Sequence, residues 1–203
     1  MSSDTDLRRR ILDTTRHLLV QDGYASLSMR KIARAIGYSA TSIYLYFEYT
    51  DALFHALIDE GMEQLHDELK AVEAAHAESP RARLRALCRR YVEYGLENQE
   101  YYEIMFLLRP ERMERYPANK YRRARRNLDI MAAALADGVE QGVIHADDPR
   151  VSASVIWAAL HGTVSLQLSR RVDIRIDRDA FVDAAIDQAL RGVLPVEVRP
   201  RAA

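Results

Sequence analysis

Apolar residues recur along most of the chain at the three- and four-residue spacing of helices that bury one face. This spacing predicts long or medium helices over about residues 5–22, 50–76, 79–98, 101–106, 118–141, 149–170 and 177–192, with two short helices between residues 28 and 47. Glycines follow several of these segments, and Ser or Asp precedes others, as helix ends require. The longest strand-like pattern is confined to residues 172–176. We therefore predict an all-α protein of about nine helices.

Residues 27–47 predict two short helices joined by a sharp turn. Ser28 is placed to cap the first, whose buried face has the i, i+3, i+4, i+7 spacing of Met29, Ile32, Ala33 and Ile36. Gly37 adopts positive φ at little cost, so the chain turns there, and Ser39 is placed to cap the second helix. In such a unit the second helix enters the major groove of DNA, where its outer face and its first residues reach base edges.

The second short helix has an apolar inner face and a polar outer face. Ile43 and Phe47 face inward, and the positions left to the outside or the flanks are Ala40, Thr41, Ser42, Tyr44, Leu45 and Tyr46. Two tyrosines on a short surface helix have two explanations. Either ring packs into the core, as aromatic rings usually do, or its hydroxyl bonds a phosphate while Thr41 and Ser42 approach bases.

Charge is distributed unevenly. Residues 1–47 contain seven Arg or Lys and four Asp, whereas the whole chain has a formal net charge of -1. A basic first segment on a near-neutral molecule suits a protein that touches phosphates at one end. A second basic run comprises Arg109, Arg112, Arg115, Lys120, Arg122, Arg123, Arg125 and Arg126. We interpret it as a solvated face or a partner for acidic residues elsewhere, in preference to a second DNA site.

The first 55 or so residues resemble the TetR family of transcriptional regulators. The motif is Ser28-x-x-x-Ile32-Ala33, Gly37-x-Ser39, Ile43-Tyr44-x-Tyr46-Phe47 and Ala52-Leu53. The resemblance implies a helix-turn-helix domain at residues 1–49 that binds double-stranded DNA, then a regulatory, ligand-binding and dimerisation domain at 50–194 and a tail at 195–203. It implies a regulator, by family habit a repressor, that binds a palindromic operator as a dimer and is released by a small apolar or amphipathic molecule.

The same resemblance names DNA contacts. Thr41 and Ser42 would lie at the groove, Tyr44 and Tyr46 at phosphates, and Arg30 near the backbone. Where many relatives have serine and then lysine, this chain has Tyr49 and Thr50, so a lysine contact to phosphate is missing, although Thr50 is placed to cap the next helix. The full set of candidate DNA contacts is Ser28, Arg30, Ser39, Ala40, Thr41, Ser42, Tyr44, Tyr46 and Thr50.

The last two predicted helices, about 149–170 and 177–192, are candidates for the homodimer contact. Residues 151–169 contain no Asp, Glu, Lys or Arg, so this helix is expected to be covered on more than one side. The final helix has one apolar stripe with several alanines, which fits half of a four-helix bundle across a twofold axis, or a core helix in a monomer. The motif Trp157-x-x-x-His161-Gly162 resembles the WHG-type C-terminal domain of some TetR regulators.

Aromatic, Met and His side chains in the predicted regulatory domain are candidates for contact with a small effector, since such pockets are apolar with a few polar anchors. They are Met62, His66, Tyr91, Tyr94, Tyr102, Met105, Phe106, Met131, Trp157 and His161. Each is also a normal core residue. Trp157 and His161 need hydrogen-bond partners once buried, which makes them stronger candidates than the other eight, although His161 fits a satisfied core histidine or a part of the dimer contact equally well.

Other function classes are less well supported. Glu63-x-x-His66 and Glu73-x-x-His76 match the metal element of helical di-iron proteins, but on one helix they lie about 15 Å apart at 1.5 Å per residue, too far to share two metals. The chain has no phosphate-cradling glycine loop or nucleophile elbow, so we expect no catalysis, metal or cofactor. A helical module that binds no DNA predicts the same helices, and remains an alternative.

The expected compartment is the cytoplasm. The N-terminus is polar, a single cysteine forbids an intrachain disulfide, and scattered polar residues argue against residues 151–169 as a membrane span. We interpret Cys88 as a packing residue rather than a redox sensor, which would need an exposed thiolate.

Overall fold

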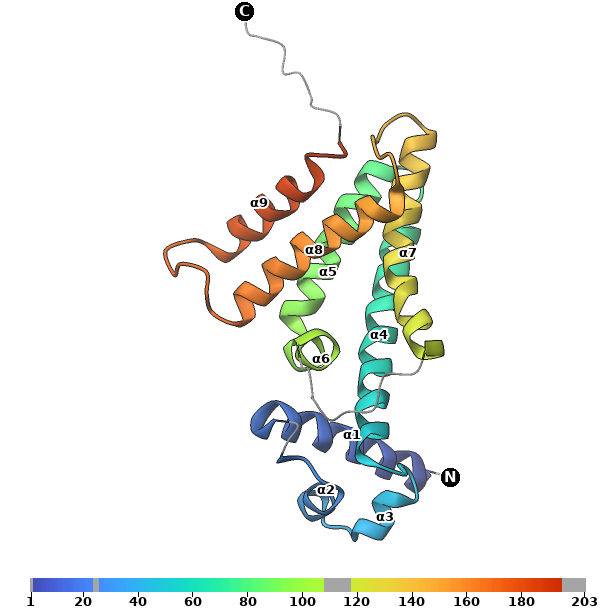
Figure 1. The fold of residues 1–203 in the computed structure, drawn as a ribbon, viewed down its shortest axis with the longest axis vertical. Coiled ribbons are helices and arrows are strands. Elements are labelled where there is room, and N and C mark those ends of the chain that lie inside the picture. The colour runs from blue at the N-terminus through green and yellow to red at the C-terminus, as the bar shows by residue number, and fades with distance from the viewer. Residues whose placement is uncertain (1, 24–25, 108–117, 195–203) are drawn as a thin grey trace, which may run out of the picture. The chain divides into compact units, whose positions relative to one another are not determined.

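The computed structural model describes residues 2–23, 26–107 and 118–194 (Figure 1). Within these ranges the chain forms nine α-helices, one π-helical stretch and no strand, which confirms the all-α prediction. The elements are α1 (Ser2–Asp22), α2 (Met29–Ile36), α3 (Ala40–Tyr44), α4 (Thr50–Ala75), α5 (Pro80–Glu97), α6 (Gln99–Tyr102), η2 (Glu103–Leu107), α7 (Ala118–Glu140), α8 (Pro149–Leu168) and α9 (Arg178–Leu190).

The chain divides into two compact units. The first unit comprises Met1–Gln64 and Asn98–Ala124, and the second comprises Leu65–Glu97 and Arg125–Ala203. Helix α4 therefore contributes its first part to one unit and its last part to the other. The domain boundary predicted between residues 49 and 50 stays a prediction.

The first unit is built on one apolar core. Helices α1, α2, α3, the first part of α4, α6 and η2 all contribute side chains to it. Its buried residues are Ile11, Leu12, Leu19, Leu27, Met29, Ile32, Ala33, Ile36, Ile43, Phe47, Leu53, Phe54, Leu57, Ile58, Tyr101 and Ile104. Because α6 and η2 pack against α1, a segment about 100 residues along the chain belongs to the same core as the helix-turn-helix.

In the second unit, α8 packs against both α5 and α9, and α5 also contacts α9. By length and composition α8 is the one helix of the described part of the chain that would suffice to cross a membrane. It buries only one face, through Ala153, Ile156, Leu160, Thr163 and Val164. The expectation that α8 is covered on more than one side is therefore not met within a single chain, and its opposite face is exposed.

The apolar stripe predicted on the last helix is split by the packing. Val182, Ile186 and Leu190 are buried, whereas Phe181, Ala185 and Ala189 are half-buried. Cys88 is fully buried on α5, and burial raises the pKa of its thiol to about 12. The thiolate form is therefore suppressed, as a packing role requires.

Helix ends agree with the local signals in the sequence. Asp148 accepts hydrogen bonds from Arg150 N and Val151 N at 2.8 and 3.2 Å, Asp177 accepts one from Ala180 N at 2.8 Å, and Ser79 accepts one from Ala82 N at 3.3 Å. Gly23 and Gly142, which follow α1 and α7, have φ of 74° and 69°. These caps are set by neighbouring residues alone, which is why the sequence predicts them.

Three details differ from the sequence prediction. The predicted short helix at 101–106 is α6 followed by the π-helical η2, because a window of six residues cannot distinguish the two helix types. Helices α8 and α9 end at Leu168 and Leu190, each two residues earlier than predicted, and Arg170 follows α8 with φ of 54°. Helix α3 ends at Tyr44, although Phe47 N still donates to Ile43 O at 3.0 Å. The basic residues from Arg109 to Arg123, which were predicted to form a solvated face or to pair with acidic residues, lie outside the described side chains.

Candidate nucleic-acid interface and effector residues

The turn between α2 and α3 has the predicted geometry. Ser28 has extended backbone, and its hydroxyl accepts a hydrogen bond from Lys31 N at 3.2 Å. Gly37 has φ of 76°, and Tyr38 N donates to Ala33 O at 2.9 Å, which closes α2 with the bond pattern of a Schellman motif. These observations confirm Ser28 as a helix cap and Gly37 as the corner.

Helix α3 begins at the second predicted cap. The Ser39 hydroxyl accepts a hydrogen bond from Ser42 N at 3.1 Å and lies 2.9 Å from the Ser42 hydroxyl. Ser42 is half-buried, and its side chain is engaged with the cap. For Ser42 to contact a base, its hydroxyl must bond the base edge in addition to, or in place of, the Ser39 hydroxyl. The sequence alone does not predict this hydroxyl pair.

The outer face of α3 carries three exposed side chains. Ile43 is fully buried, Thr41 on the opposite side is exposed, Tyr44 is 54% exposed and Leu45 is 82% exposed. Tyr46 is half-buried against the core of the first unit, and Ala40 is half-buried too. The two tyrosines therefore differ in exposure. Tyr44 is available to a phosphate, whereas the Tyr46 ring packs partly against the core and is only partly accessible.

Two cations of α2 face solvent. Arg30 and Arg34 are exposed and lie four residues apart, hence on the same side of the helix, and neither forms an ion pair with a described residue. Lys31 differs, since it pairs with Asp22 at 3.0 Å. Arg10 donates to Ile36 O at 3.1 Å and lies over the Tyr38 ring at 5.4 Å, which ties α1 to the end of α2.

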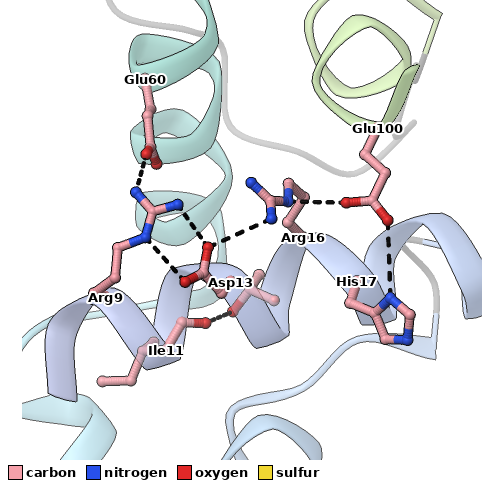
Figure 2. A network of polar contacts seen from close by, with 8 residues as sticks. Arg9, Ile11, Asp13, Arg16, His17, Glu60 and Glu100 are labelled. Carbon is pink, nitrogen blue, oxygen red and sulfur yellow. Dashed lines mark hydrogen bonds and ion pairs between the residues drawn. The ribbon is translucent and has the colours of Figure 1, made fainter. Parts of the chain in front are cut away.

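Other arginines of α1 belong to an internal network, which Figure 2 shows. Arg9 forms ion pairs with Asp13, at 2.6 Å, and with Glu60 of α4. Arg16 lies 2.9 Å from Glu100 of α6 and 3.5 Å from Asp13. The hydrogen bonds from Arg9 to Asp13 and then to Glu60 raise the pKa of its guanidinium. The net positive charge counted over residues 1–47 is thus partly neutralised by acids from later in the chain.

Thr50 is the first residue of α4 and is half-buried. Tyr49 is 43% exposed beside it. Together with Thr41, Tyr44, Arg30 and the exposed cap residues Ser28 and Ser39, these positions form the candidate DNA surface of the first unit.

Four of the ten candidate effector residues lie in the first unit. Tyr102 is fully buried and its ring centre lies 5.0 Å from that of Phe106. Met105 packs so closely on α4 that a Cβ placed at Gly61 would lie 2.7 Å from its sulfur. Met62 is half-buried against the core. These four residues lie on α4, α6 and η2, and α4 and α6 also carry Glu60 and Glu100, the ion-pair partners of Arg9 and Arg16.

The other six candidates lie in the second unit. Trp157 Nε1 donates to Tyr91 Oη at 3.0 Å, and the Trp157 ring stacks on His161 with centres 5.3 Å apart and planes at 27°. Burial lowers the pKa of His161, which keeps its imidazole neutral. His66 Nδ1 lies 2.8 Å from Asn127 Oδ1, and Tyr94 and Met131 are buried. The hydrogen bond that Trp157 was expected to need is therefore made within the chain.

The two Glu-x-x-His elements have local roles in the structure. His66 bonds Asn127, and His76 Nδ1 lies 3.1 Å from Val72 O in its own helix. Among the described residues, no three His, Cys, Asp or Glu side chains are grouped so that they could hold one metal ion.

Sequence reasoning left three residues out of the candidate surface or its support. Leu45 and Arg34 are exposed beside Thr41 and Arg30 on their helices. Leu45 was expected on the outside or flank of its helix but was not included among the candidate DNA contacts. Glu100 is the third. Its pairing with α1 depends on two segments 84 residues apart, for which no local signal exists.

Comparison with known proteins yields two family models. Residues 11–57 match the model described as bacterial regulatory proteins of the tetR family, and residues 84–189 match a tetracyclin repressor-like C-terminal domain. The chain is 40% identical over 58 residues to the HTH-type transcriptional repressor Rv1474c of Mycobacterium tuberculosis. That match covers 29% of this chain and 31% of the relative, so the chain spans about a third of the length of the curated protein it matches.

Solved structures extend the likeness to the full length. A protein of unknown function from Rhodococcus sp. RHA1 is 26% identical with a TM-score of 0.79, and the match covers 93% of this chain and 96% of that one. The SmeT–triclosan complex is 18% identical with a TM-score of 0.75, covering 97% and 95%, and at that identity it supports the fold alone. The finer likeness to the WHG-type domain stays a prediction.

Proposed function

Because this chain belongs to the TetR family of bacterial transcriptional regulators, we propose that it is a ligand-responsive repressor that binds a palindromic operator as a dimer. Its family consists of regulators of transcription rather than enzymes. The single observation that carries the proposal is the capped α2–Gly37–α3 unit, with Ile43 buried and Thr41, Tyr44 and Leu45 turned outward. We infer the cytoplasm as its compartment, since that is where a bacterial regulator meets DNA.

We assign α3 to the major groove. The exposed Thr41 hydroxyl is the polar group of α3 nearest its start that is not engaged in capping, so it is the first candidate for a base edge. Tyr44 and the two exposed arginines of α2, Arg30 and Arg34, suit phosphate oxygens. Ser28, Ser39, Ala40, Ser42, Tyr46 and Thr50 complete the proposed contact surface.

We assign the exposed face of α8, with α9, to the dimer contact. Val151, Val155 and Leu166 are 59%, 65% and 43% exposed, and a helical wheel at 100° per residue puts them within about 60° of each other. Ala158 and Gly162 lie in the same sector and are small enough for close helix approach. A contiguous apolar face on a long helix is the usual mark of an interface, and a second copy of α8 and α9 is the proposed occupant.

We propose that the effector is neutral or only weakly polar. The candidates in the second unit offer Tyr91, Trp157 and a neutral His161 as polar anchors among apolar side chains, and none of these carries a charge at neutral pH. A small apolar or amphipathic molecule is the ligand class that such a surface recognises.

We propose that the effector acts on the spacing of the two DNA-binding heads. In the first unit, η2 carries Met105 and Phe106, and the adjoining α6 carries Glu100, which pairs with Arg16 of α1 (Figure 2). The proposed anchors Tyr91, Trp157 and His161 lie in the second unit, so we propose that a ligand there acts on the first unit through α4, the helix that contributes residues to both units. Half-sites one helical turn apart require a centre spacing of about 34 Å, so a shift of a few ångströms per head is enough to weaken binding, provided the ligand prefers the DNA-incompetent arrangement.

The decisive experiment is a gel shift with the DNA upstream of the protein's own gene at two salt concentrations. A sequence-specific repressor gives a complex that survives excess unrelated DNA and weakens with salt, because phosphate contacts release counterions. Binding that is weak and blind to sequence would refute the repressor assignment and favour the helical interaction module. A Thr41→Ala variant should lose specific affinity while keeping its fold, and Ala71→Ser, on the exposed side of α4, serves as the matched control.

The effector half of the proposal has its own test. A library of neutral amphipathic compounds is added to the protein–operator complex, and release of DNA is followed by fluorescence anisotropy. If one class of compounds releases the DNA from the wild type but not from His161→Leu, the result supports the proposal of a neutral or weakly polar effector bound near His161. DNA binding that no compound shifts would remove the sensing role and leave the DNA-binding role intact.

A further inference from the structure

Leu45 is the most exposed large apolar side chain of the helix-turn-helix. It is 82% exposed, against 54% for Tyr44 and 43% for both Tyr38 and Tyr49. A single exposed leucine on a protein surface normally needs no explanation. This one, however, lies at the end of the helix assigned to the major groove, where the exposed face is the part that meets a base.

The direction of Leu45 follows from the helix geometry. Its backbone, with φ of -67° and ψ of -24°, continues the helical conformation of α3. At 100° per residue, Thr41 and Leu45, two positions before and after Ile43, both lie about 160° from it. Since Ile43 is fully buried in the core, Thr41 and Leu45 form the outermost ridge of α3, four residues apart and on the same side.

The chemistry of Leu45 restricts what it recognises. Its side chain has no hydrogen-bonding atom, so it gains nothing from a phosphate, a sugar hydroxyl or the polar edge of a base. In the major groove the one apolar group on a base edge is the C5-methyl of thymine. Arg30 and Arg34 are exposed on α2 of the same helix-turn-helix, so this unit as a whole suits polyanionic DNA better than an apolar protein partner.

We propose, building on the DNA-binding function above, that Leu45 is a specificity-determining residue that contacts a thymine methyl in each operator half-site. Thr41 positions the polar half of the same ridge against the neighbouring base edge. The operator therefore contains one thymine per half-site whose methyl group, rather than its hydrogen-bonding edge, is read by the protein.

The test isolates that methyl group. The operator is first selected from random duplex DNA with the full-length protein, and each thymine is then replaced singly by deoxyuridine, which removes the methyl and keeps the base pair. Fluorescence anisotropy gives Kd for the wild type, for Leu45→Ala and for the control Val139→Ala, a residue 39% exposed on α7.

One thymine per half-site should be sensitive in the wild type and in the control. At the value typical of one buried methyl group, its replacement weakens binding about fourfold, and replacement in both half-sites weakens it about 15-fold. In Leu45→Ala the same replacement should have no effect. A loss of equal size in Leu45→Ala, or no sensitive thymine at all, overturns the inference while leaving DNA binding established.

A second variant keeps the inference testable if Leu45→Ala binds too weakly to measure. Selection with Leu45→Asn should change the preferred base at the one position assigned to Leu45, from thymine to adenine, since asparagine pairs with the adenine edge. The other operator positions should be unchanged. An unchanged operator overturns the role of Leu45, whereas failure of the wild type to select any operator overturns the proposed function itself.

Discussion

Gly138 on α7 supports a prediction about stability: a close contact with the turn after the helix decides whether replacement by alanine stabilises or destabilises the protein. A Cβ at this position would lie 2.4, 2.6 and 2.9 Å from Cδ1, Cγ1 and Cβ of Ile144. The Ile144 side chain cannot easily withdraw, because its own Cβ is involved and its backbone is anchored. Val143 N and Ile144 N both donate to Gly138 O, at 2.9 and 3.0 Å. Replacing Gly138 by alanine therefore forces α7 and the following turn apart.

The expected destabilisation is the difference of two opposing effects. Alanine in a helix interior is favoured over glycine by about 1 kcal/mol, whereas overpacking typically costs about 1–3 kcal/mol. Since branched Ile144 is held at its backbone, we take the upper end of that range, which leaves Gly138→Ala less stable by about 2 kcal/mol. For a chain of this size each kcal/mol changes Tm by about 2–4 °C, so Tm should fall by about 4–8 °C.

Gly162 provides the matched control, because it also lies inside a helix but a Cβ there meets nothing within 4 Å. Gly162→Ala should raise Tm by about 2–4 °C through helix propensity if the dimer is retained, because Gly162 also lies on the proposed dimer face. Thermal unfolding followed by circular dichroism at one protein concentration compares the two, and light scattering checks that Gly162→Ala keeps its oligomeric state. If Gly138→Ala proved as stable as the wild type, the close contact with Ile144 would be refuted.

Three further predictions concern the second unit. Val155→Lys should weaken association about 100-fold, because two valines of about 1.5 kcal/mol each leave the interface, and light scattering should then show a monomer. The control Ala71→Lys should remain dimeric. A dimeric Val155→Lys would contradict the assignment of α8 to the dimer contact. Burial lowers the pKa of His161 below its ordinary 6.5, so as the pH falls the unfolded chain binds a proton at this residue before the folded chain does. The free energy of unfolding should therefore decrease as the pH drops through 6.5. Urea midpoints measured between about pH 7.5 and 5 should fall less steeply for His161→Gln than for the wild type. Cys88, buried with a pKa raised to about 12, should resist thiol reagents at pH 8 until urea unfolds the protein, and rapid labelling of the native protein would disprove its burial.

Local chemistry made the helix-turn-helix predictable. Ser28 and Ser39 cap α2 and α3 through hydrogen bonds to residues three positions along, and Gly37 turns the chain by adopting a φ that other residues resist. Each of these interactions spans only a few residues, so their pattern is present in the sequence before any tertiary contact forms.

The outward direction of the DNA-binding residues was only partly predictable. Ile43 and Phe47 were expected inward and are buried, but no pattern distinguished the exposed Tyr44 from the half-buried Tyr46. Their difference depends on the core contributed by other helices of the first unit. The Ser39–Ser42 hydroxyl pair likewise depends on rotamers that spacing does not specify.

By itself, the order of residues determined which segments are helical, where most of them begin and end, and which side of each is apolar, because capping, glycine φ and the 3.6-residue repeat act over a few positions. Only the tertiary structure decided that Arg9 and Arg16 pair with Glu60 and Glu100 instead of remaining available to DNA, and that the candidate effector residues divide between two units. Ion pairs and packing join segments far apart in the chain, and their energies depend on distances that arise only when the helices meet.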